Sequence, residues 1–376
     1  MKKEEIRGLI IYALLIATAV IVALAVVRPL MDEYSPNMNQ LLFFVIVIVV
    51  AYLTNAIGLE LLHLLGALFG GYKITSFNIL YLCFYKEKDK WKLGFRDFNG
   101  LTGETKIAPK REKTNINWFL WFPLFGFAIE LATCIVVRIL VVGAKEPAAP
   151  WLVPAAIITL LVASLLAFYN FVPLKLDTMT DGYRIRLFTN PANVEAYNEM
   201  LKLQEARRLG ENVEKVPVFT EITEYTAEIN TIAIFEFLGA EKYKEAGEII
   251  DLLCENTKVL TLKEYYRLIA QKLYVAVMTQ EMKDVKKLYE DICPVEMRRF
   301  IANDTELATI RAYMIIAGMI EDSESEVLFA KSKLEKAKRK ASPTEVKTEE
   351  LLIEKALELI YKSHPKWTKE KESAAE

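Results

Sequence analysis

The stretch LLFFVIVIVVAYLTNAIGLELLH, residues 41–63, decides the fold of the first half of the chain. No charged residue occurs from Leu41 to Leu59, and this run is close to the roughly 20 apolar residues that a helix needs to cross a bilayer. Glu60 and His63 follow, three positions apart on one helical face. A carboxylate and an imidazole at membrane depth are costly unless they face protein, water or an ion. The stretch therefore indicates a membrane span with a polar site near its end.

Three other segments of the first half are apolar enough to cross a membrane. Residues 8–27 and 151–172 contain no charge, and residues 117–142 contain one glutamate and one arginine. A cleaved signal peptide is the alternative for residues 8–27. The run is longer than a usual signal h-region. We therefore predict four spans.

Lysine and arginine are unevenly distributed among the loops of these spans. The amino terminus and the connection between the second and third spans are rich in them, whereas the other two connections are poor. Because basic loops stay on the cytoplasmic side, both termini are expected in the cytoplasm. Glu60 and His63 then lie toward that side. We expect a multi-pass protein of a bacterial cell membrane.

The basic connection also carries strand signals. Residues 74–85 and 91–98 are rich in aromatic and β-branched side chains, and the polar residues 86–90 separate them. This pattern predicts a β-hairpin on the cytosolic side.

After residue 172 the composition becomes that of a soluble helical protein. A helix is expected to begin at Asn190-Pro191, because proline suits the first helical position. The three helix pairs predicted after it are 221–238 with 241–255, 262–278 with 281–292, and 304–318 with 323–341. Residues 237–246, FLGAEKYKEA, resemble the turn region of a tetratricopeptide unit. The later matches are irregularly spaced, so the repeat signal is weak.

Ser342-Pro343-Thr344-Glu345 has the spacing of a capping box and predicts a final helix. The predicted domains are a membrane domain (1–190), a cytosolic helical-repeat domain (191–341), and a carboxy-terminal helix with a disordered tail (342–376). The predicted fold class is mainly α. It combines a four-span polytopic membrane domain, a cytosolic β-hairpin insertion and an α-helical, tetratricopeptide-like domain.

Charge and cysteine content exclude some function classes. The formal net charge of -2 argues against nucleic acid as a partner. The four cysteines are dispersed, without C-x-x-C pairs. They are therefore expected to be reduced packing residues rather than a disulfide framework or a thiolate metal site.

A second polar segment follows the fourth predicted span. It contains Asn170, Pro173, Asp177 and Asp181-Gly182. The second and fourth spans both run toward the cytosol, so a carboxylate of this segment can reach His63.

The order of these residues resembles the site-2 protease family of intramembrane zinc metallopeptidases. Members place H-E-x-x-H on one span and an Asn, Pro and Asp-Gly motif at the end of a later one. The resemblance covers residues 41 to about 187, and residues 71–77, GYKITSF, also look like the family. It implies Glu60 as the catalytic base, His63 and Asp181 as metal ligands, and Asn170 beside the substrate backbone. Asp177 stays open as an alternative to Asp181, because it lies closer to the usual spacing from Pro173.

The chain departs from the family motif at Leu59, where the first zinc-ligand histidine is expected. A leucine has no lone pair to donate, and catalytic zinc is usually held by three protein ligands. We therefore expect a pseudoprotease that binds peptides or proteins without hydrolysis. The alternative is an active zinc metalloprotease with an altered metal site, cleaving membrane or leader peptides. Zinc is expected only in that second case, and otherwise no cofactor.

The resemblance also bears on partners. In that family a hairpin between these spans presents an edge to an extended substrate, which fits strand addition. A hairpin lying on the lipid surface is an equal alternative. The expected partners are membrane lipid, a peptide or membrane-protein client, and a protein partner of the helical domain. A third hypothesis treats the spans only as an anchor for a helical scaffold.

Overall fold

A computed structural model of the chain divides it into two compact units, Met1–Val194 and Glu195–Glu376. We call them the amino-terminal unit and the helical unit. The boundary falls inside helix α8 (Pro191–Leu209), close to the predicted boundary at residue 190. The structure describes residues 3–34, 39–79, 81–87, 90–95, 102–111, 113–143, 149–174, 179–209, 216–339, 341 and 343–367.

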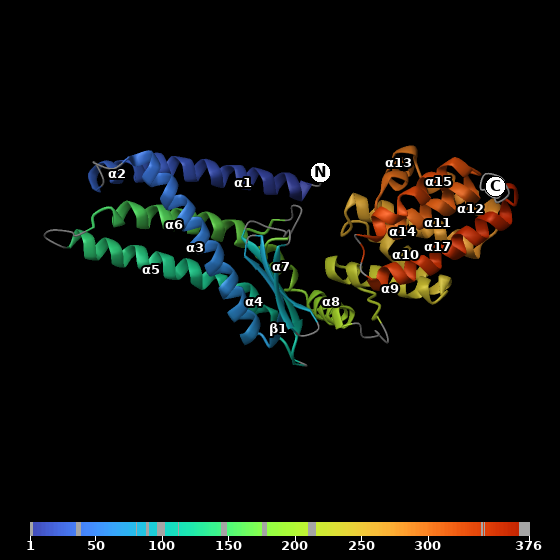
Figure 1. Ribbon diagram of the computed structural model, residues 1–376, viewed down its shortest axis with the longest axis horizontal. Helices are drawn as coiled ribbons and strands as arrows, with labels where there is room; N and C mark the ends of the chain where they lie inside the picture. The colour runs from blue at the N-terminus through green and yellow to red at the C-terminus, as the bar shows by residue number, and fades with distance from the viewer. Residues whose placement is uncertain are drawn as a thin grey trace. The chain divides into compact units, whose positions relative to one another are not determined.

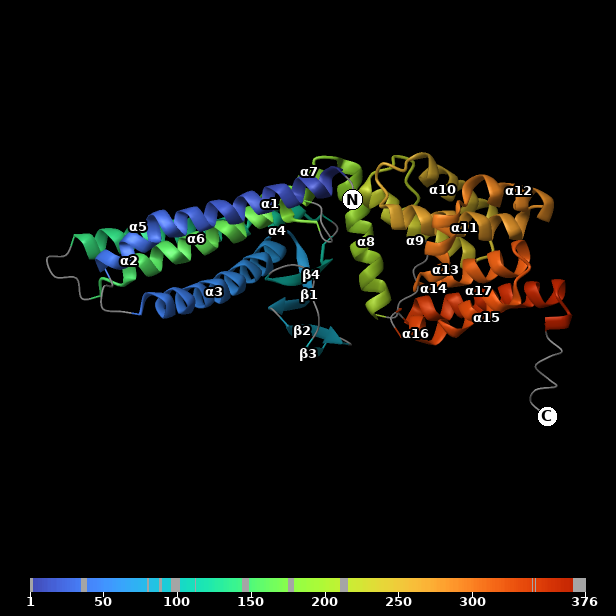
Figure 2. The ribbon, with the colours of Figure 1, turned by 90° about the horizontal axis from the view of Figure 1, so that it is seen from above.

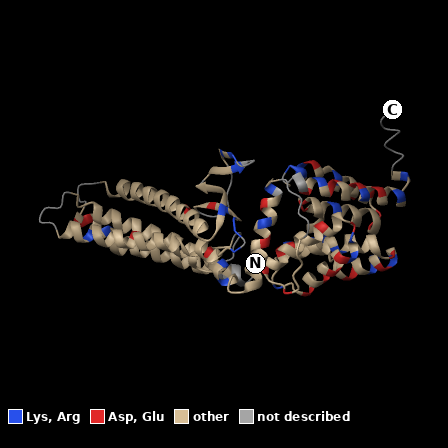
Figure 3. Cartoon of the chain, turned by 90° about the horizontal axis from the view of Figure 1, so that it is seen from below, with Lys and Arg blue, Asp and Glu red and all other residues tan. Residues whose placement is uncertain are grey.

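The amino-terminal unit contains four helical stretches that are long and apolar enough to cross a membrane: Gly8–Tyr34, Gln40–Phe69, Ile116–Val142 and Leu152–Phe171. They match the four predicted apolar segments. Figure 3 shows few charged residues along these helices, in contrast to the many on the helical unit.

Seven helical elements make up these stretches, and Figure 1 labels the α-helices among them. They are α1 (Lys3–Val22), a π-helical turn η1 (Ala23–Val27), α2 (Arg28–Tyr34), α3 (Gln40–Phe69), α4 (Ile116–Trp121), α5 (Pro123–Val142) and α6 (Leu152–Phe171). Helix α6 packs against α1, α3 and α5, and Tyr12 of α1 meets Tyr169 of α6 edge to face, with ring centroids 5.9 Å apart. Many large apolar side chains point outward, as suits lipid contact.

A four-stranded antiparallel sheet follows α3 (Figure 2). Its strands are β1 (Tyr72–Ile79), β2 (Leu82–Glu87), β3 (Lys90–Phe95) and β4 (Gly103–Pro109), in the order β3-β2-β1-β4. The predicted hairpin was therefore incomplete. The stretch 74–85, predicted as one strand, contributes to two strands, β1 and β2, with Ile79 paired to Leu82. The unpredicted β4 pairs with β1 through a polar sequence whose strand state depends on that partner.

A short helix, α7 (Asp181–Leu187), follows α6 and packs on α6 and α4. Asp177 lies outside the described residues.

The helical unit confirms the first two predicted pairs: α9 (Glu224–Gly239) with α10 (Tyr243–Glu255), and α11 (Leu262–Thr279) with α12 (Met282–Ile292). The remaining elements are α13 (Val295–Asn303), α14 (Leu307–Ile315), the π-helical turn η2 (Ile316–Ile320), α15 (Glu324–Ser332), α16 (Leu334–Lys338) and α17 (Pro343–Ser363). Helix α13 was not predicted, and the last member of the third pair is broken at Lys333. The predicted cap at Ser342 lies outside the described residues.

A buried arginine ties three helices of this unit together. Arg311 of α14 is 0% exposed, and its guanidinium donates to Glu349 of α17 at 2.8 Å and to Gln271 of α11 at 2.9 Å. It also lies 4.0 Å from the ring centroid of Tyr274. Helix α17, predicted to lie outside the helical-repeat domain, therefore completes the core of this unit.

We expect the substitution Glu349→Ala to destabilise the helical unit strongly. It leaves the buried Arg311 without its carboxylate, and breaking a buried ion pair costs about 3–5 kcal/mol. The neighbouring Glu350 pairs with Lys338 at the surface, so Glu350→Ala is the matched control and should cost less than about 1 kcal/mol. Denaturant midpoints followed by circular dichroism on the full chain in detergent measure both. Equal midpoints for the two variants would contradict the role of Arg311.

Candidate functional site

The structure brings together three of the predicted site residues. Glu60 and His63 come from α3 and Asp181 begins α7, and their exposed fractions are 3%, 8% and 8%. The Nε2 atom of His63 lies 3.3 Å from Oδ2 of Asp181. Asn170 lies near the end of α6, half-buried, and its side chain makes no hydrogen bond within the described part of the chain. Its predicted role beside a substrate stays a prediction.

Asp181 is held in place by the residues on either side of it. The hydroxyl of Thr180 donates to the carbonyl of Val172 at 2.7 Å and accepts from the backbone N–H of Leu174 at 3.1 Å. A Cβ on Gly182 would lie 1.9 Å from the carbonyl oxygen of Phe171, so only glycine fits against the end of α6. The glycine of the Asp-Gly pair therefore brings α7 close enough for its first residue to reach His63.

The orientation of His63 is fixed by a backbone carbonyl. Its Nδ1 lies 3.1 Å from the carbonyl oxygen of Phe119 in α4. A carbonyl oxygen only accepts, so Nδ1 carries the hydrogen and donates it. The Nε2 atom then faces the Asp181 carboxylate. Two electron-rich atoms in this position need a cation between them, either a proton or a metal ion.

Glu60 is bound to the edge strand β4. The hydroxyl of Thr102 donates to Oε1 at 3.2 Å, and that of Thr105 donates to Oε2 at 2.7 Å. A Cβ on Gly103 would lie 2.0 Å from the carbonyl oxygen of Asn78 and 3.0 Å from Cγ of Glu60. The absence of a side chain there lets the strand approach the helix, and both carboxylate oxygens have partners.

Reasoning from the sequence missed the two threonines and the carbonyl that complete the site. Thr102 and Thr105 lie in a segment that carries many basic residues, which we explained by membrane topology. The pattern Thr102-Gly103-x-Thr105 offers two hydroxyls around a glycine, and it could have been noted as a hydrogen-bonding segment. Its partner could not be named, because β4 was not predicted to pair with β1.

Comparisons of the chain with protein-family models, curated proteins and solved structures gave no match.

The positions of the possible ligand atoms test whether a zinc ion fits this site. The separation of 3.3 Å between His63 Nε2 and Asp181 Oδ2 is about that of two ligands on one tetrahedral zinc, given bonds of about 2.0–2.1 Å. Among the described residues no third ligand accompanies this pair: Leu59 is buried and apolar, and the two oxygens of Glu60 accept hydrogen bonds from threonine hydroxyls. No group of three metal-binding side chains occurs among the described residues.

These residues therefore do not fit a three-ligand catalytic zinc site. They form a brace that joins α3 to three neighbours: to α7 through Asp181, to α4 through the Phe119 carbonyl, and to β4 through Thr102 and Thr105. The brace holds the sheet and α7 at one end of the apolar helices.

We expect Asp181→Asn to preserve this brace and Asp181→Ala to weaken it. The asparagine amide can donate to Nε2 of the tautomer that carries its hydrogen on Nδ1. Alanine leaves a buried acceptor unsatisfied, at a cost of about 1–3 kcal/mol. Thermal unfolding of the detergent-solubilised chain, followed by tryptophan fluorescence, measures the difference. If both variants lose the same stability, the pair does not act as a hydrogen-bonded brace.

Proposed function

We propose that the amino-terminal unit is a pseudoprotease related to the site-2 protease family, which binds peptide or protein segments without hydrolysing them. The order of the site residues along the chain supports the relationship, together with the approach of His63, within one apolar helix, to Asp181, which follows another. The observation that carries the loss of hydrolysis is the buried, apolar Leu59, which stands where the motif has its first histidine.

Peptide hydrolysis at such a site needs a metal-activated water and a general base within hydrogen-bond reach of it. Glu60 is the predicted base, and each of its oxygens accepts one hydrogen bond, from Thr102 or Thr105, which leaves a lone pair on each. Leu59, one helical turn before His63, offers an apolar side chain where the motif supplies a ligand. The requirement that these residues fail to meet is therefore the metal-activated water.

The sheet supplies a surface for binding an extended segment. Strand β3 is one of its two edges, and three alternate side chains on it are exposed: Trp91 by 49%, Leu93 by 61% and Phe95 by 82%. An edge strand with unpaired backbone groups and exposed apolar side chains is a template for another strand. Strand addition at β3 gives affinity through the backbone and some specificity through these side chains.

A second candidate function is an active zinc metalloprotease that cleaves membrane or leader peptides. The separation of 3.3 Å between His63 Nε2 and Asp181 Oδ2 favours it, because one metal ion could bind both atoms. The helical unit, in either case, binds a protein partner on the cytoplasmic side of a bacterial membrane.

The two functions differ in zinc content and peptide turnover. We expect the purified full chain in detergent to hold well under one zinc per chain and to cleave no peptide from a random library. Leu59→His supplies a third ligand and should raise zinc retention, whereas Leu59→Gln, polar but a poor zinc ligand, should not. One bound zinc with turnover abolished by Glu60→Gln would establish the protease and refute the pseudoprotease.

Photo-crosslinking separates peptide binding from lipid contact at the sheet. A benzophenone amino acid placed at Phe95 of β3 should form adducts with protein when the chain is in its native membrane. The same probe at Phe125 of α5, which is 54% exposed, is the control and should form adducts with lipid. Lipid adducts alone at both positions would mean that β3 lies on the bilayer and binds no strand.

A further inference from the structure

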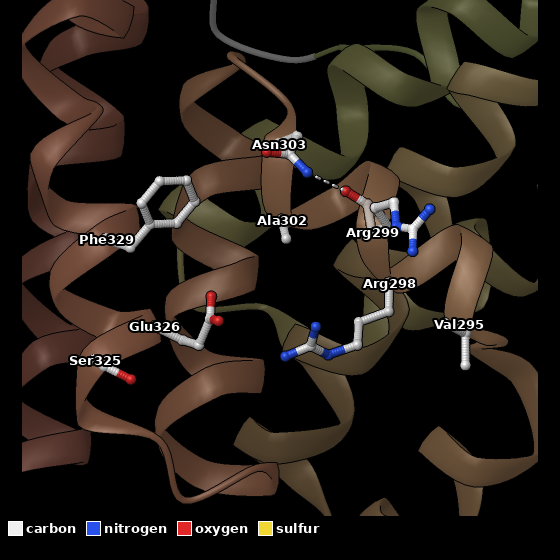
Figure 4. Close-up of a pocket in the computed structure, with 8 residues that line it drawn as sticks. All are labelled: Val295, Arg298, Arg299, Ala302, Asn303, Ser325, Glu326 and Phe329. Atoms are coloured by element: carbon white, nitrogen blue, oxygen red, sulfur yellow. Dashed lines mark hydrogen bonds between the residues drawn. The ribbon is translucent and has the colours of Figure 1, made fainter.

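A groove runs along the helical unit between α13 and the two helices α15 and α16. Its larger part is a hollow of about 480 Å³. The hollow is lined by Val295, Arg298, Arg299, Ala302, Asn303, Ser325, Glu326 and Phe329 (Figure 4). A second hollow of about 220 Å³ shares Asn303 and Phe329 with it and continues to Lys333 and Lys336. The two hollows together form one groove with Phe329 at its middle.

The groove carries an excess of positive charge. Four cations line it, and the single lining carboxylate, Glu326, accepts a hydrogen bond of 2.6 Å from the hydroxyl of Tyr313. Arg298 is paired with Glu321. Within the described part of the chain, Arg299, Lys333 and Lys336 belong to no ion pair. Three cations are thus available to an anion from outside.

Lys333 is the most constrained of the three. It sits at the break between α15 and α16, and its Nζ donates to the carbonyl of Ala302, in the last turn of α13. The ammonium also lies 4.9 Å from the ring centroid of Phe329. Burial lowers the pKa of Lys333, although the charges of Asp304 and Glu326 act in the opposite direction, because a partly desolvated cation is disfavoured. An anion entering the groove would relieve that cost.

The groove also offers apolar surface and a defined length. Val295 is 75% exposed and Phe329 45%, and both line it. From Ser325 to Lys336 the helices rise about 16 Å at 1.5 Å per residue. That length suits about five residues of an extended peptide at about 3.3 Å each.

We propose that this groove binds an acidic peptide segment of a partner protein. Carboxylates of the segment meet Arg299, Lys333 and Lys336, and an apolar side chain packs on Phe329 and Val295. This inference rests on the proposed function in one respect: that function gives the helical unit a protein partner, and the inference names the chemistry of that partner. It does not depend on what happens at Glu60 and His63.

A recessed groove favours a peptide over a bilayer surface. Ala302, on the α13 side, is 7% exposed, so the groove is deeper than the side chains along its rim. A flat array of lipid headgroups would reach the exposed Lys336 and Val295 but not the carbonyl end of α13, where Lys333 is held. A single extended chain can follow the groove past all three cations.

The test is the affinity of a fluorescein-labelled hexapeptide of alternating glutamate and leucine for the full chain in detergent, measured by fluorescence anisotropy. We expect saturable binding that weakens with added salt, since the groove is open to solvent. A hexapeptide with glutamine in place of glutamate should bind at least tenfold more weakly. Equal affinity for both peptides would overturn the proposal.

Variants locate the binding site. Arg299→Gln with Lys336→Gln should weaken the glutamate peptide about tenfold or more, whereas Lys283→Gln with Lys287→Gln on α12 removes two exposed cations elsewhere and should not. Circular dichroism checks that both proteins stay folded. As a second measurement, Phe329→Ala should weaken the glutamate and leucine peptide but not one with glycine in place of leucine. Equal loss in the α12 control would overturn the assignment to the groove.

Two further outcomes separate this proposal from others. If dihexanoylphosphatidylserine binds with the same sensitivity to Arg299→Gln and Lys336→Gln while the peptide does not bind, the groove is a lipid headgroup site and the proposal fails. If zinc-dependent cleavage is found but peptide affinity at the groove persists, the proposed function fails and this inference stands.

Discussion

The amino-terminal unit depends on how two polar side chains at the end of an apolar helix find partners. Both side chains are almost fully buried, so their polar atoms must be satisfied by the protein or by an ion. Glu60 and His63 receive partners from a strand, a helix carbonyl and an acidic residue that starts a short helix. The sheet and α7 are therefore placed by the same few bonds that make the helix tolerable in an apolar setting.

The same bonds give Glu60 a structural role that does not depend on catalysis. In this chain the bonds of Glu60 go to Thr102 and Thr105, and the position before it holds a buried leucine. Loss of the glutamate would remove a structural bond, so the residue retains a role even if no peptide bond is cut.

Much of the architecture could be predicted from the sequence, because it follows from patterns within a single segment. Long uncharged runs predicted the four apolar helices, and helical periodicity predicted α9 to α12. The order of Glu60, His63 and Asp181 predicted their meeting. Strand β4 could not be predicted, since its polar sequence GETKIAP becomes a strand through pairing with β1, some thirty residues earlier. Thr102 and Thr105 were missed for that reason, and α13 because nine residues give few periods to recognise.

The bonds between Glu60 and β4 have a mechanical consequence. Hydrogen bonds between antiparallel strands run perpendicular to them, so a load along β3 is carried in shear through β2 to β1. Strand β1 follows α3 directly along the chain, and β4, on the other side of β1, is fastened to that helix through the two threonine hydroxyls. The sheet is therefore attached to the second apolar helix at two places, one covalent and one hydrogen-bonded, and both resist its separation.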